Sequence, residues 1–195
     1  MSDQDADRVV ERFRATNGRI SGYLGLGCAA VILALAIAAW DAGQPLGWAI
    51  IALLGGLLAW VAMLRPAMWV TDRDLVLRSM YHTDAVPLAA IDKVAVGQVT
   101  AVTVDEKRYV SPVVGYSARQ TIMQRAGARK PSAKTASAAD TYQVFVEERI
   151  AHLAKEARER YGDPAGAGVR RTYAWPEIVG TGLLVVAFLV WLVIF

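Results

Sequence analysis

Three long apolar runs constrain the fold of this chain more than any other feature of its sequence. They cover residues 20–40, 45–64 and 178–195, and each contains at most one charged or strongly polar side chain. A helix rises about 1.5 Å per residue, so a run of about 20 residues crosses a hydrocarbon layer of about 30 Å. A charge at that depth costs about 2.5–3.5 kcal/mol. The separation of apolar from charged sequence therefore predicts three transmembrane helices.

The first two runs are joined by residues 41–44, a tight turn that predicts an antiparallel helical hairpin over residues 20–64. A cleaved signal peptide is the other explanation for an apolar run so close to the N-terminus. The run is too long for that, it lacks a clear small-residue cleavage site, and a second run follows it at once. We therefore expect a hairpin of two spans, and a third span at residues 178–195.

The distribution of Lys and Arg predicts the orientation of these spans. Four basic residues precede the first run, the hairpin turn has none, and the other 17 of the chain's 21 lie between the second and third runs. Basic residues are retained on the cytoplasmic side of a membrane. We expect a multi-pass protein of the plasma membrane, with residues 1–19 and the middle segment in the cytoplasm and the C-terminus on the outer face.

Short alternating runs in the middle segment, residues 65–161, predict an antiparallel β meander. Five strands are expected, the fourth of which begins with an irregular turn and has a bulge or bend at Gly97. They cover residues 67–71, 74–80, 81–88, 89–104 and 107–112. Residues 1–19 are expected to be partly an amphipathic helix, and residues 162–177 a linker back to the membrane.

An amphipathic helix is predicted after the meander, from Asp140 to about Tyr161. Asp140 followed by Gln143 fits a capping box at the helix start. Apolar residues recur along one stripe of this helix, namely Tyr142, Val146, Ile150, Leu153 and Ala157. Such a stripe must cover an apolar surface, and the nearest one is the meander.

Several of these segments resemble the bacterial pleckstrin-homology (PH) domains of actinobacterial membrane proteins. The similar stretches are VTDRDLVLRS (70–79), VPLAAIDKVAV (86–96), GYS (115–117) and FVEERIAHLAKEAR (145–158). The resemblance covers about residues 65–160 and implies a small PH-like barrel closed by a C-terminal helix, often preceded by a transmembrane hairpin. A full barrel of the resembled kind has about seven strands, so the resemblance implies either that the last strands come from residues 110–125 or that the barrel is incomplete.

Basic residues are concentrated in a stretch that lacks apolar bulk, residues 119–139, which we expect to be a mobile loop. Positive charge close to the cytoplasmic leaflet attracts anionic lipid by about 1 kcal/mol per residue. The alternative is a loop that charge merely keeps soluble. No aromatic residues are interleaved with the charges, which argues against nucleic acid. The candidate lipid contacts are Arg119, Arg125, Arg129, Lys130, Lys134, Arg170 and Arg171.

Small residues in the first two apolar runs suggest where these helices touch. Small side chains at a spacing of four let helix backbones approach closely. Packing within the chain's own bundle is favoured over a separate dimer face. The candidate packing residues are Ser21, Gly25, Ala29, Gly55 and Gly56.

No convergent set of reactive groups is evident in the sequence. The two histidines are 70 positions apart, the one cysteine, Cys28, lies within an apolar run, and Asp72 and Asp74 fit a solvated turn. We expect no cofactor, no metal and no enzymatic activity. The leading hypothesis is a membrane protein that presents its PH-like domain for protein interaction or scaffolding. The alternatives are an accessory subunit of a larger respiratory or envelope-synthesis complex, a module that senses anionic lipid, and, least favoured, an enzyme.

Overall fold

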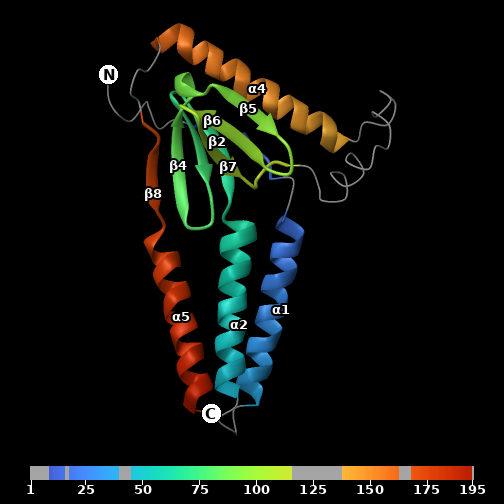
Figure 1. The fold of residues 1–195 in the computed structure, drawn as a ribbon. Helices are drawn as coiled ribbons and strands as arrows, with labels where there is room; N and C mark the ends of the chain where they lie inside the picture. The colour runs from blue at the N-terminus through green and yellow to red at the C-terminus, as the bar shows by residue number, and fades with distance from the viewer. Residues whose placement is uncertain (1–8, 16–17, 40–44, 116–137, 163–167, 195) are drawn as a thin grey trace. The chain divides into compact units, whose positions relative to one another are not determined.

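The structure, a computed structural model, describes residues 9–15, 18–39, 45–115, 138–162 and 168–194 (Figure 1). The chain divides into two compact units. The sheet unit contains Met1–Asn17, Pro66–Ser79 and Thr83–Thr172, and the helical unit contains Gly18–Arg65, Met80–His82 and Tyr173–Phe195.

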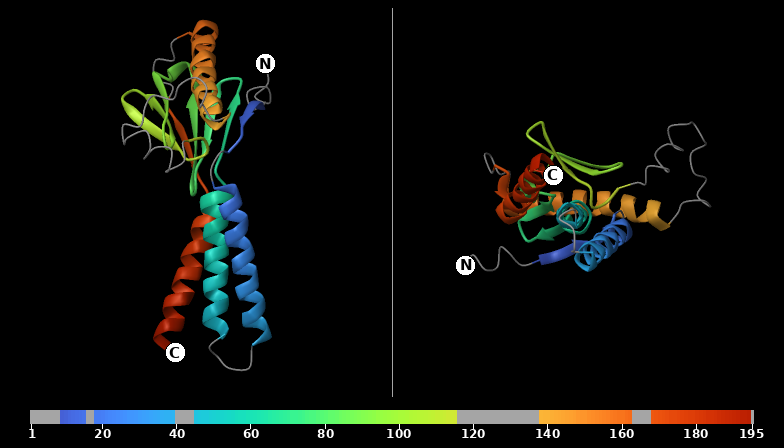
Figure 2. Two further views of the ribbon diagram at one scale, coloured as in Figure 1. Left: turned by 90° about the vertical axis from the view of Figure 1, so that its right-hand side faces the viewer. Right: turned by 90° about the horizontal axis from the view of Figure 1, so that it is seen from below.

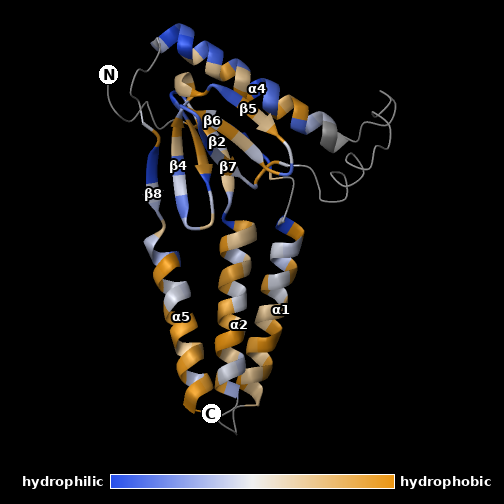
Figure 3. Ribbon diagram, in the orientation of Figure 1, coloured by the Kyte–Doolittle hydropathy of each residue, from blue (hydrophilic) through white to orange (hydrophobic). Residues whose placement is uncertain are grey.

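Three long helices form the helical unit. They are α1 (Arg19–Ala38), α2 (Pro45–Ala59), which continues as the π-helix η1 (Trp60–Leu64), and α5 (Trp175–Ile194). Each is long and apolar enough to cross a membrane, so the three predicted helices are present as candidate spans (Figure 3). Helix α2 packs against both α1 and α5 (Figure 2).

Helix α5 begins at Trp175, three residues before the predicted start of the third span. The uninterrupted apolar run begins only at Ile178, because Glu177 is charged. A proline and an acidic residue are nevertheless both favoured in the first turn of a helix, where N–H groups lack partners and the helix dipole is positive. Pro176 and Glu177 therefore belong to the helix.

The sheet unit contains two sheets. One has five strands in the order β1-β2-β3-β4-β8, and the other has three in the order β5-β6-β7, with antiparallel pairing from β1 to β4 and from β5 to β7. The strands are β1 (Val9–Phe13), β2 (Ala67–Thr71), β3 (Asp74–Arg78), β4 (His82–Pro87), β5 (Lys93–Val96), β6 (Thr100–Val104), β7 (Lys107–Ser111) and β8 (Arg170–Tyr173).

Helix α4 (Ala138–Tyr161) runs across the sheet unit, and its apolar stripe joins the core. Val146 and Ile150 of this stripe are fully buried, as are Leu75 and Leu77 of β3. The predicted helix is therefore present, but it begins two residues before Asp140. Gln143 Nε2 donates to the carbonyl of Gly115 at 2.6 Å, so its amide reaches across the unit instead of back to the helix start.

The expected fourth strand, residues 89–104, is two strands in the structure. A short 3₁₀ helix, η2 (Leu88–Ala90), comes first, and β5 and β6 then form a hairpin around residues 97–99. The valines alternate through both strands because Val94 faces Val102 across the hairpin. Gly97 therefore marks a turn, and the bend expected there is a full reversal of the chain.

Two strands lie in segments for which no strand was expected. Residues 9–13 form β1 on the edge of the larger sheet, where a partly amphipathic helix was expected, and Phe13 is buried there. Residues 170–173 form β8, where a linker was expected, and all four of them are exposed. Residues 112–115 follow β7 without forming a further strand. Residues 119–137 of the predicted basic loop (119–139) lie outside the described part of the chain.

Candidate functional site

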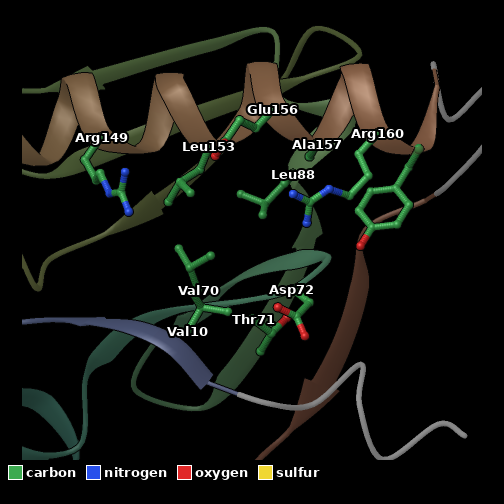
Figure 4. A pocket seen from close by; sticks show the side chains of 11 residues that line it. Val10, Val70, Thr71, Asp72, Leu88, Arg149, Leu153, Glu156, Ala157 and Arg160 are labelled. Carbon is green, nitrogen blue, oxygen red and sulfur yellow. The ribbon is translucent and has the colours of Figure 1, made fainter.

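A pocket of about 190 Å³ opens in the sheet unit between helix α4 and strands β1 and β2 (Figure 4). Four separate parts of the sequence contribute to it. The lining residues are Val10, Val70, Thr71, Asp72, Leu88, Arg149, Leu153, Glu156, Ala157, Arg160 and Tyr161.

The inner lining of the pocket is apolar. Val70, Leu88 and Ala157 are buried, and Leu153 is half-buried beside them. Val10 is 52% exposed at the mouth. The pairing of β1 with β2 shifts register between Val9 and Glu11, so Val10 is the extra residue of an irregularity. Bulges re-aim a side chain in this way, and here the result is an accessible apolar side chain at the pocket mouth.

The rim of the pocket carries two acidic and two basic side chains. Arg149 Nε donates to Glu11 Oε2 at 2.9 Å, which joins α4 to β1. Asp72 lies in the β2–β3 turn, and that turn is closed because Thr71 Oγ1 accepts from the Asp74 amide at 3.1 Å. Glu156 and Arg160 complete the rim from α4. The formal charges cancel, so the pocket has no net preference for an anion or a cation.

Size and lining together indicate what the pocket can hold. Sites for drug-sized molecules measure about 300–1,000 Å³, so this pocket is smaller. The pocket can hold one or two apolar side chains of another molecule, and polar groups next to those side chains could form hydrogen bonds or ion pairs with the charged rim. Among the described residues, no group of three or more His, Cys, Asp or Glu side chains is placed to hold a metal ion.

The two described candidates for lipid contact are both paired with carboxylates of the sheet unit. Arg170 Nη2 lies 2.5 Å from Asp74 Oδ2. Arg171 donates to both oxygens of Asp84, at 2.7 and 2.9 Å. The other five candidates, Arg119, Arg125, Arg129, Lys130 and Lys134, lie outside the described residues.

The five candidates for helix packing fall into two groups. A Cβ added to Gly25 would lie 3.2 Å from Ala59, and one added to Gly56 would lie 3.3 Å from Ala29, so these positions face the neighbouring helix. Ser21 is exposed, and a Cβ added to Gly55 would meet nothing within 4 Å.

A polar cluster at one end of the helical unit was not anticipated from the sequence. Arg65 is 8% exposed, and its Nε donates to Glu177 Oε1 at 2.8 Å. Its Nη1 donates to the carbonyl of Met80, also at 2.8 Å. In the sequence, Arg65 served only to orient the spans. The position of an Arg and a Glu at the ends of two successive spans was the signal that could have revealed the pair.

Comparison of the chain with protein-family models, with curated proteins and with solved structures finds no match. The pocket and the polar cluster are therefore interpreted from their own geometry.

Proposed function

We propose that this chain is a non-catalytic protein of the plasma membrane whose sheet unit lies on the cytoplasmic face and binds another protein. Three helices of the required length and hydropathy support the membrane anchor. The basic residues on both sides of the hairpin, and their absence from its turn, support the cytoplasmic placement. An accessory subunit of a larger membrane complex is one form of this proposal, in which the partner is itself resident in the membrane.

The pocket beside α4 is the observation that carries the proposal. It combines buried apolar groups with a rim of balanced charge, and the exposed Val10 extends its apolar surface outward. Protein interfaces have this composition, with an apolar centre and a polar rim. A segment of a partner that inserts one or two apolar side chains would bury them against Val70 and Leu88.

A PH-like architecture is part of the same proposal. Strands β1–β7 in two antiparallel sheets, followed by a helix whose apolar stripe enters their core, support it. In such a domain the sheets provide a rigid frame, and binding takes place at surfaces left between the strands and the helix. Strand β8, which lies beside β4 at the edge of the larger sheet, is not part of this seven-stranded arrangement.

Site-specific photocrosslinking in living cells tests the proposal. A photoreactive phenylalanine would replace Val10 at the pocket mouth and, as a control, Val110 on β7, because the two valines are 52% and 49% exposed. We expect position 10 to capture one defined protein that position 110 does not capture, and Leu153→Arg to abolish that adduct. Equal capture at both positions, or adducts that survive Leu153→Arg, would reject the pocket as a binding site.

Cysteine labelling tests the orientation separately. In a Cys28→Ala background, Gln44→Cys in the hairpin turn predicted from the sequence should react with an impermeant maleimide in intact cells. Asp105→Cys, in the exposed turn between β6 and β7, should react only after permeabilisation. The reverse pattern would place the sheet unit outside the cell and remove the cytoplasmic part of the proposal.

A further inference from the structure

Residues Met80–His82, which join β3 to β4 and include the first residue of β4, belong to the helical unit, although the rest of both strands belongs to the sheet unit. We propose that this hairpin tip, together with Tyr173 and Trp175, is a lipid-contact surface that lies at the boundary between phospholipid headgroups and acyl chains. The inference is independent of the pocket and of any protein partner.

Three hydrogen bonds hold the tip against the ends of the helices. The Met80 carbonyl accepts from Arg65 Nη1 at 2.8 Å, and the Tyr81 carbonyl accepts from the Ala174 amide at 2.9 Å. The Tyr81 hydroxyl and Thr181 Oγ1 are 3.3 Å apart. The tip is therefore bonded to residues at the end of η1 and at the start of α5.

These bonds set the depth of the tip. Thr181 lies six residues into α5, which at the rise of a helix is about 9 Å from its first residue. The candidate span itself begins at Trp175. The Tyr81 hydroxyl therefore lies beside residues that belong to a span. Irregular backbone is tolerated at that level only where its polar groups have partners, and the carbonyls of Met80 and Tyr81 both have them.

The exposed side chains around the tip suit this boundary. Met80, Tyr173 and Trp175 are 36%, 54% and 66% exposed. The rings of Tyr173 and Trp175 are neighbours, with centroids 6.4 Å apart. Tyr and Trp concentrate at membrane interfaces because one part of the ring is apolar while the O–H or N–H reaches water.

The charge balance around the tip indicates whether its contact with lipid depends on the headgroup charge. Arg65 is paired with Glu177 at 2.8 Å, so the cation beside the tip is neutralised within the unit. Contact of Met80, Tyr173 and Trp175 with lipid is instead favoured by the burial of apolar surface and by the preference of Tyr and Trp for the membrane interface. We therefore expect it to contact neutral and anionic phospholipid alike, unlike the basic residues considered for electrostatic binding.

Depth-dependent quenching tests the inference on the full chain in vesicles. Met80→Cys in a Cys28→Ala background would carry an environment-sensitive fluorophore. The expected result is strong quenching by lipid spin-labelled near the headgroup end of the acyl chain, and weaker quenching by lipid labelled deeper. The wild-type chain labelled at Cys28, the exposed cysteine at the middle of α1, is the control and should show the opposite order.

Three outcomes would overturn the inference. Quenching of the Met80→Cys label by aqueous iodide and not by spin-labelled lipid would place the tip in water. Lipid quenching that appears only in vesicles containing anionic phospholipid would mean that charge, and not the neutral surface, holds the tip. Lipid quenching that is lost as the protein-to-lipid ratio rises would mean that a second copy of the chain covers the tip.

Discussion

Arg171 forms a bidentate ion pair with Asp84: Nε lies 2.7 Å from Oδ1, and Nη2 lies 2.9 Å from Oδ2. The Asp84 carboxylate is 5% exposed, while the Arg171 side chain is 43% exposed. The pair joins β8, every residue of which is exposed, to β4 in the larger sheet. Arg171, a candidate for lipid contact in the sequence, is thus engaged within the sheet unit.

Arg171→Ala should lower the free energy of unfolding of the sheet unit. The change removes two hydrogen bonds to a buried carboxylate, and hydrogen bonds to charged groups contribute about 1.5–3 kcal/mol. Arg171→Lys should recover only part of the loss, because an ammonium cannot form the two parallel bonds. Pulse proteolysis of the detergent-solubilised chain in increasing urea would measure the change.

Arg170→Ala is the matched control for that experiment. Its partner is Asp74, and the Arg170 side chain is 73% exposed, so solvent screens the pair. Surface pairs contribute about 0–1 kcal/mol, and the urea midpoint should hardly move. A fall in the urea midpoint of Arg170→Ala as large as that of Arg171→Ala would contradict the expected difference between the two pairs.

Gly115→Ala should also destabilise the sheet unit. An added Cβ would overlap the backbone carbonyl of Gln98, and backbone cannot move aside as a flexible side chain can. Overpacking of this kind costs about 1–3 kcal/mol. Gly97→Ala is the control, since a Cβ there meets nothing within 4 Å. The same urea series on both variants checks the expectation, and a Gly115→Ala midpoint equal to the wild type would contradict it.

The helices could be predicted from the sequence because their signal is long and local. About 20 successive apolar residues leave few alternatives. The sequence of strand β8, Arg-Arg-Thr-Tyr, contains no such signal, because it does not alternate and none of its residues is buried. The strand lies beside β4, and its two arginines form ion pairs with Asp74 and Asp84. Those partners are more than 80 residues away in the chain, so no local pattern indicates them.

The pocket could not be predicted for a related reason. Val10, Val70, Leu88 and Leu153 come from four distant segments, and each fits an ordinary core or surface position in its own segment. Only the irregular pairing of β1 with β2 at Val10 and the course of α4 bring them to one place. The predicted apolar stripe of α4 did include Leu153 and Ala157, but it could not show that the stripe's edge remains open.

The Arg65–Glu177 pair should show strong coupling in a double-mutant cycle. Arg65→Met leaves Glu177 without the guanidinium, and Glu177→Gln leaves the buried cation without its carboxylate, so each single variant should be less stable. Residues in contact couple by about 0.5–3 kcal/mol. The loss in free energy of unfolding should be smaller for the double variant than the sum of the losses for the two single variants. SDS-induced unfolding followed by circular dichroism would measure these losses. Additive losses would show that the two side chains act independently.

Two adjacent glycines on α2 give the sharpest test of how the hairpin packs. A Cβ at Gly56 would lie 3.3 Å from Ala29 of α1, whereas a Cβ at Gly55 would meet nothing within 4 Å. Gly56→Leu should therefore force α1 and α2 apart and lose the dispersion contacts that small residues permit. Gly55→Leu should be neutral or slightly stabilising, because leucine favours the lipid phase by about 0.3–0.6 kcal/mol.

The same contrast exists on α1, where Gly25 approaches Ala59 and Gly27 meets nothing within 4 Å. Gly25→Leu should behave like Gly56→Leu, and Gly27→Leu like Gly55→Leu. SDS-induced unfolding of the bicelle-reconstituted chain would order the four variants. Because both members of each pair make the same chemical change at nearly the same membrane depth, hydropathy and helix propensity cancel. Equal stability within a pair would mean that α1 and α2 do not meet at these residues in the membrane.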